Sequence, residues 1–98
     1  MTQSATDQLT QLRERIDALD AELVALLARR FALTREVGQL KKTHQLPPSD
    51  PAREAAQTQR ITALAELNAV PPQVAERVLR VIVDEVVAEH RQIANVAI

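Results

Sequence analysis

The chain has 98 residues, which limits it to one domain. Hydrophobic residues make up 46% of it and charged residues 26%, a balance typical of globular proteins and not of disordered ones. The 12 basic and 13 acidic side chains leave a net charge of −1. Such a balance argues against indiscriminate binding to nucleic acids or to anionic membrane surfaces.

Several residue types are absent or rare, and each absence excludes a class of chemistry. Without cysteine the chain has no disulfide, thiol nucleophile or thiolate metal site, and with one glycine it has no glycine-rich phosphate loop. The two histidines, His44 and His90, do not have the spacing of a zinc site, so we expect no metal. One aromatic residue is too few for base stacking. Residues 1–8 lack the pattern of a signal peptide, which predicts a cytoplasmic protein without a membrane span.

Five prolines lie at two places and divide the chain into three segments rich in helix formers. None of the segments alternates apolar and polar residues with the period of a strand. Asp50 followed by Pro51 is typical of a helix N-cap with proline at the first helical position. The sequence therefore predicts an all-α fold in a single domain, 1–98, with a disordered tail over 1–7 and helices over about 8–42, 50–68 and 71–95.

The first predicted helix carries an apolar stripe that is too long for a monomer. A helix over residues 8–42 would be about 52 Å long at ~1.5 Å per residue, whereas a compact globule of this chain length is about 33 Å across. Either the helix breaks at Gly38 or a second chain covers it, and the continuous stripe favours an interlaced antiparallel homodimer. The stripe consists of Leu9, Leu12, Ile16, Leu19, Leu23, Leu26, Leu33, Val37 and Leu40.

Two cations lie on or near this apolar face. Arg30 takes a position where the stripe predicts a leucine, and burying a guanidinium costs several kcal/mol unless an anion meets it. Lys41 follows eleven residues later, about 20° round the helix at about 100° per residue. Both cations either pair with acids of other helices or form an anion site. In an antiparallel dimer the partner's Arg13 would approach them, although alone it is typical of a solvated surface residue.

The third segment shows a similar anomaly at His90, which continues an apolar row that includes Val86. A histidine there is either a satisfied core residue or a hydrogen-bond donor to a ligand between helices. The start of the second segment places three charged residues within one turn: Asp50, Arg53 and Glu54. The two acids are either favourable at a helix N-terminus, with an ion pair to the arginine, or all three belong to the site. These residues do not include a nucleophile with a base to activate it. An enzyme built from them would therefore act by orienting a small polyanionic substrate and by stabilising charge in its transition state.

The stretches LRERIDALDAELVALLARR, EVGQLKK and SDPARE closely resemble the all-helical class of chorismate mutases, over about Leu9 to Arg91. The resemblance implies a three-helix protomer in an interlaced homodimer with two equivalent active sites. It implies the Claisen rearrangement of chorismate to prephenate, the shikimate-pathway step toward phenylalanine and tyrosine, with no cofactor. The end of the chain at Ile98 leads us to expect a standalone form.

The resemblance also implies roles for individual residues. Arg13 of the partner chain and Arg30 would bind the two carboxylates of chorismate, and Lys41 would contact a carboxylate and the ether oxygen. Asp50 and Glu54 would orient the ring hydroxyl. Arg53 would add positive charge nearby.

Two positions depart from the family pattern. His90 stands where members often carry glutamine or glutamate on the ether oxygen. Since it keeps a possible donor, we expect the catalytic set to be Lys41, His90 and Arg30. Val86 stands where some members carry serine, so it would form a wall of the pocket without a hydrogen bond.

Two other functions remain open at this stage. Isochorismate pyruvate-lyase activity occurs on the same fold, and Asp50 argues weakly against it. A non-catalytic helical dimer that binds another shikimate-pathway enzyme would keep the apolar stripes. It would have no use for Arg30 and Lys41 on the buried face.

Overall fold

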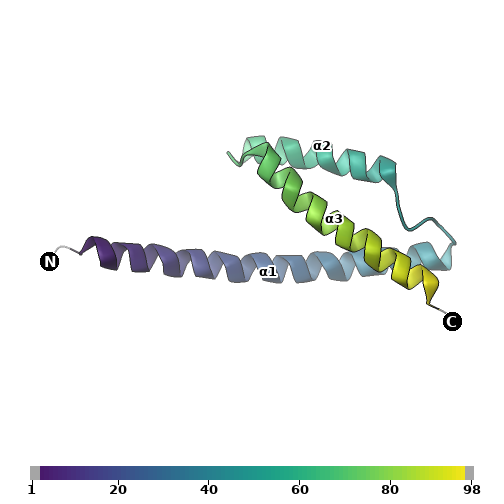
Figure 1. Ribbon diagram of the computed structural model, residues 1–98, viewed down its shortest axis with the longest axis horizontal. Coiled ribbons are helices and arrows are strands. Elements are labelled where there is room, and N and C mark those ends of the chain that lie inside the picture. The colour runs from purple at the N-terminus through teal and green to yellow at the C-terminus, as the bar shows by residue number, and fades with distance from the viewer. Residues whose placement is uncertain (1–2, 97–98) are drawn as a thin grey trace. The chain divides into compact units, whose positions relative to one another are not determined.

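The structure is a computed structural model that describes residues 3–96, and within that range it contains three α-helices and no strand (Figure 1). These are α1 (Ala5–Thr43), α2 (Pro51–Leu67) and α3 (Pro72–Asn95). The predicted all-α fold is therefore confirmed. None of the described helices is long and apolar enough to cross a bilayer.

The chain divides into two compact units, an N-terminal unit that ends at Leu33 and a C-terminal unit that begins at Thr34. The N-terminal unit consists of most of α1. The C-terminal unit contains the last ten residues of α1, 34–43, together with α2 and α3. Each unit is described by itself below.

The first helix starts earlier than the sequence predicts. The Ser4 hydroxyl accepts a hydrogen bond from the backbone N–H of Asp7 at 3.0 Å, and Asp7 places an acid in the first turn. Both features stabilise a helix start, so the prediction of a disordered tail is wrong for residues 5–7. Residues 1–2 of that tail lie outside the described range. At its other end α1 continues through Gly38 to Thr43, so the alternative of a break at the glycine is wrong.

The second and third helices run in opposite directions side by side (Figure 1). Asp50 caps α2 by accepting from the backbone N–H of Arg53 at 3.1 Å, and Pro51 is the first helical residue, as predicted. Ala65 of α2 and Leu79 of α3 are buried. The hydroxyl of Thr62 donates to Glu76 at 2.7 Å and ties the two helices together on the polar side of this contact.

The apolar stripe of the N-terminal unit is open to solvent in the single chain. Its six members from Leu9 to Leu26 are 45–62% exposed. Leucine and isoleucine side chains in a continuous row at this exposure form a patch larger than monomeric proteins usually leave uncovered. This face of α1 therefore lacks a partner within the described chain.

Two turns end with a left-handed residue that is not glycine. At the end of α1, Gln45 has a φ of 56°, and the N–H of Leu46 reaches back to the carbonyl of Lys41 at 2.8 Å. At the end of α2, Ala69 has the same φ, and the N–H of Val70 reaches the carbonyl of Ala65 at 2.9 Å. Both are Schellman motifs, in which glycine is the preferred residue.

We predict that Ala69→Gly stabilises the protein by about 1 kcal/mol, because it removes the clash of Cβ in the left-handed region. Thermal unfolding at a fixed protein concentration should show a Tm higher by about 4 °C or more. The matched control is Ala63→Gly at an exposed position inside α2, which should lower stability by about 1 kcal/mol. Equal destabilisation by the two substitutions would contradict the left-handed turn at Ala69.

Candidate functional site

The predicted site residues fall in both units. Lys41, Asp50, Arg53, Glu54, Val86 and His90 belong to the C-terminal unit, and Arg13 and Arg30 belong to the N-terminal unit. Within the C-terminal unit, the structure brings Lys41 and His90 into direct contact. It places Glu54 in a cavity between α2 and α3.

The contact between Lys41 and His90 joins the end of α1 to the end of α3. Lys41 Nζ lies 3.5 Å from Nδ1 of His90 and donates to the backbone carbonyl of Pro48 at 3.1 Å. The other ring nitrogen, Nε2, lies 2.7 Å from the backbone carbonyl of Thr34. The ring is 4% exposed, and the lysine is half-buried. The ammonium group is therefore fixed by the loop before α2 and by α3.

The only glycine of the chain lies against this ring. A Cβ added to Gly38 would come within 2.8 Å of Cδ2 of His90 and 2.9 Å of Cδ1 of Ile93. Carbon atoms do not approach that closely without displacement, so Gly38 is required for the ring to fit between the helices. This close approach explains a glycine inside a helix, where it otherwise costs about 1 kcal/mol relative to alanine.

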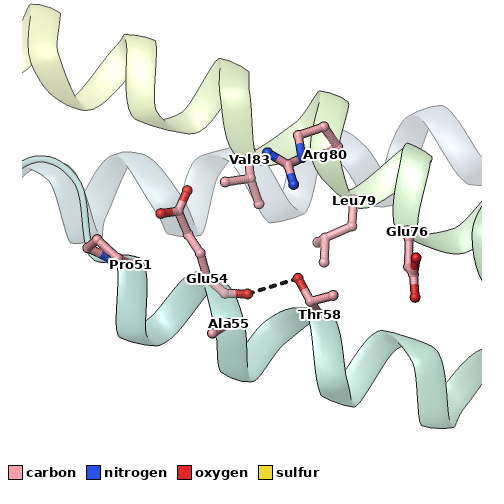
Figure 2. Close-up of a pocket in the computed structure, with 8 residues that line it drawn as sticks. All are labelled: Pro51, Glu54, Ala55, Thr58, Glu76, Leu79, Arg80 and Val83. Carbon is pink, nitrogen blue, oxygen red and sulfur yellow. Dashed lines mark hydrogen bonds between the residues drawn. The ribbon is translucent and has the colours of Figure 1, made fainter.

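The acidic residues of α2 have two different environments. Asp50 is exposed and uses one oxygen for the helix cap, and Arg53 is also exposed. Glu54 is half-buried and lines a cavity of about 310 Å³ between α2 and α3. Figure 2 shows its carboxylate and the guanidinium of Arg80 directed into the space between the two helices. The lining residues are Pro51, Glu54, Ala55, Thr58, Glu76, Leu79, Arg80 and Val83.

The two arginines of the N-terminal unit also differ from each other. Arg13 is exposed, whereas Arg30 is half-buried. Nη1 of Arg30 is buried and has no hydrogen-bond partner among the described residues. A buried guanidinium N–H without an acceptor is costly, so this atom is suited to an incoming anion.

Val86 is half-buried on α3, one turn before His90. It is not among the residues that line the cavity between α2 and α3, so its role as a wall of the pocket stays a prediction.

Four groups in this region were missed or misread from the sequence. Arg80 is exposed and lines the cavity, but nothing in the sequence singles it out, and Gly38 is predicted only as a weak point of the helix. The carbonyls of Thr34 and Pro48 are backbone atoms, which no side-chain pattern signals. A glycine in the middle of a helix, close to the cationic residue Lys41, was the one usable clue to a close helix contact.

Comparison with known proteins identifies relatives of this chain. Residues 12–91 match the model of a family described as chorismate mutase type II. A T-protein of Enterobacter agglomerans is 42% identical over 78 residues, which are 80% of this chain and 21% of that protein. A chorismate mutase of Methanocaldococcus jannaschii is 26% identical over 86 residues, 88% of this chain and 87% of that protein. A 4-amino-4-deoxychorismate mutase of Streptomyces pristinaespiralis is 33% identical over 86 residues, 88% of this chain and 64% of that protein. The chain thus spans about a fifth of the length of the T-protein.

We predict that Gly38→Ala destabilises the protein, because its Cβ would overlap the His90 ring. Overpacking a dense core costs about 1–3 kcal/mol, and two approaches under 3 Å put this case at the upper end. That cost exceeds the gain of about 1 kcal/mol in helix propensity. Urea or thermal unfolding measures the difference.

A double-mutant cycle assigns that loss to the ring. In a His90→Ala background the ring is gone and the end of the Ile93 side chain can move, so Gly38→Ala should be neutral or stabilising. The same loss in both backgrounds would show that the ring does not lie against Gly38.

Proposed function

Because the chain belongs to the chorismate mutase type II family, we propose that it is a chorismate mutase, an isomerase that rearranges chorismate to prephenate. In this reaction the ether C–O bond of chorismate breaks as a C–C bond forms between its enolpyruvyl arm and its ring. Both changes occur within one molecule, with no leaving group and no external proton. The protein therefore has to orient the substrate and to stabilise charge.

The observation that carries this proposal is the unpartnered Nη1 of Arg30. Chorismate has two carboxylates, and a buried guanidinium binds a carboxylate with strong charge-assisted hydrogen bonds. A purely structural arginine would have an acid of its own. Arg30 therefore supports an anion site better than it supports a structural ion pair.

The remaining site residues supply complementary chemistry under this proposal. Lys41 carries a fixed positive charge toward a carboxylate and toward the ether oxygen, where negative charge grows as the C–O bond breaks. Glu54 accepts a hydrogen bond from the ring hydroxyl of chorismate. Asp50 and Arg53 lie nearby, at the N-terminus of the same helix. Val86 limits the pocket on the α3 side.

We propose further that the active protein is a homodimer in which Arg13 of one chain completes the site of the other. The support is the exposed row of leucine and isoleucine from Leu9 to Leu26, together with the position of Arg13 beside that row. A second copy of the same helix offers the matching apolar surface. Without a second copy, this apolar row would stay in water, and the monomer would lose the free energy that its burial provides.

We predict that the purified protein consumes chorismate, which can be followed by the loss of its absorbance. Arg30→Leu should lower kcat/KM by about 10²-fold or more, because a desolvated carboxylate loses its partner at a cost of about 3 kcal/mol. The same substitution removes a buried charge from the apolar stripe, so the Tm should stay level or rise.

Other outcomes of this test would favour a different role for Arg30, a different substrate or a non-catalytic function. A lower Tm with normal turnover would make Arg30 a structural residue. Faster consumption of isochorismate or of 4-amino-4-deoxychorismate than of chorismate would replace the proposed substrate. No turnover of any of the three by folded protein would favour a non-catalytic helical module.

We predict that Arg13→Ala and Arg30→Ala proteins, each inactive alone, regain activity when they are unfolded and refolded together. One site of each mixed dimer then has both arginines intact. The recovered activity should approach a quarter of the wild-type value per chain, because about half of the dimers are mixed and each has one complete site. Sedimentation at low micromolar concentration should show twice the monomer mass. A folded active monomer, or no recovery despite proven subunit exchange, would refute the shared site.

A further inference from the structure

We infer that His90 is a positioning residue that holds the ammonium group of Lys41 in place, and that it does so as a neutral ring with its proton on Nε2. The sequence suggests a different role, direct donation to the ether oxygen. The inference rests on the proposed function only in that Lys41 is the group being positioned for chorismate.

The two partners of the ring determine its protonation. A carbonyl oxygen can only accept, so the Nε2 atom that lies 2.7 Å from the Thr34 carbonyl carries the hydrogen. An ammonium group can only donate, so the Nδ1 atom that lies 3.5 Å from Lys41 Nζ is the acceptor. Both ring nitrogens are thus engaged by α1, and neither has an N–H left for a substrate.

The lysine is held from two sides. An ammonium group has three N–H bonds, of which one points to the Pro48 carbonyl and one to His90. The third is left for a ligand. Fixing a long flexible side chain costs up to about 2 kcal/mol of rotamer entropy. Because Lys41 is already fixed in the free protein, substrate binding does not carry this cost.

The ring itself cannot easily change its contacts. It is 4% exposed, and the space it occupies exists only because Gly38 has no Cβ. To reach a substrate, Nε2 would have to leave the Thr34 carbonyl, and a buried N–H and a buried carbonyl would both be left without partners. The position of the ring therefore favours an action through Lys41.

Two substitutions of His90 test the roles of its two ring nitrogens separately. The Oδ1 of asparagine lies at the same number of bonds from Cα as Nδ1, so His90→Asn keeps an acceptor for Lys41. The amide nitrogen of glutamine corresponds to Nε2, so His90→Gln keeps the donor and leaves Lys41 without its acceptor. The control is Ile93→Ala, which perturbs the same contact with Gly38 and removes no hydrogen-bonding group.

We predict that His90→Asn keeps kcat for chorismate within about tenfold of wild type, whereas His90→Gln lowers kcat by about 10²-fold, the scale of a misplaced catalytic group. KM should change less than kcat, since the ammonium stabilises charge that grows only in the transition state. Ile93→Ala should lower the Tm and leave both parameters near wild type. Higher kcat for His90→Gln than for His90→Asn, at similar Tm, would overturn the inference and assign direct donation to the ring.

A second measurement does not depend on activity. Nitrogen NMR of ¹⁵N-histidine protein, with His90 assigned by comparison with His90→Asn, should show a protonated Nε2 and an unprotonated Nδ1. The Nδ1 signal should move in Lys41→Met, which removes the donor and keeps much of the side chain's volume, while the exposed His44 stays unchanged. An Nδ1–H tautomer, or an Nδ1 signal that Lys41→Met does not move, would overturn the inference even if His90→Asn fails to fold. Absence of chorismate turnover with the expected NMR result would instead refute the proposed function alone.

Discussion

The close approach of α3 to α1 at Gly38 is the constraint on which the C-terminal unit depends. The His90 ring fills the space that a Cβ would otherwise take, and it joins the Thr34 carbonyl to the Lys41 ammonium. Because the ring lies between the helices, it fixes the spacing of α3 and α1 and the direction of the lysine together. A larger residue than glycine at position 38 would overlap the ring and displace it from its contacts with Thr34 and Lys41.

Lys41 and Arg30 show two ways in which a protein can hold a cation near an apolar face. Lys41 is half-buried and has neutral acceptors on two sides, so the protein solvates its charge, and no acid within residues 3–96 forms an ion pair with it. Arg30 has a buried N–H with no acceptor in the described chain. Neither arrangement is the one expected of a structural ion pair, in which an acid would cancel the charge. Within the described residues, each of these cations therefore keeps its charge available to an anion.

The helices could be predicted from the sequence because prolines, a cap and good helix formers all indicate the same segments. The start of α1 was placed three residues late, since Ser4 and Asp7 form a cap within a polar stretch that has no apolar period. The candidate residues were found by a different signal: Arg30 and His90 each interrupt an apolar row, and Lys41 lies near one. Their surroundings could not be predicted, because the groups that hold Lys41 and His90 are backbone carbonyls of Thr34 and Pro48. Carbonyl positions depend on how elements distant in sequence pack, which no local pattern encodes.

The two acids of the α2 start illustrate how local structure divides roles between neighbouring residues. One carboxylate oxygen of Asp50 accepts a hydrogen bond from the backbone N–H of Arg53, and this cap sets where α2 begins. Glu54 lies one turn later, so the register fixed by Asp50 places its carboxylate on the side of α2 that faces α3 (Figure 2), in the cavity that Arg80 also lines. A helix that began one residue later would rotate its register by about 100° relative to the entering chain and carry Glu54 away from the cavity. Asp50 therefore contributes to the proposed site through the helix that it starts, and Glu54 contributes through the carboxylate that lines the cavity.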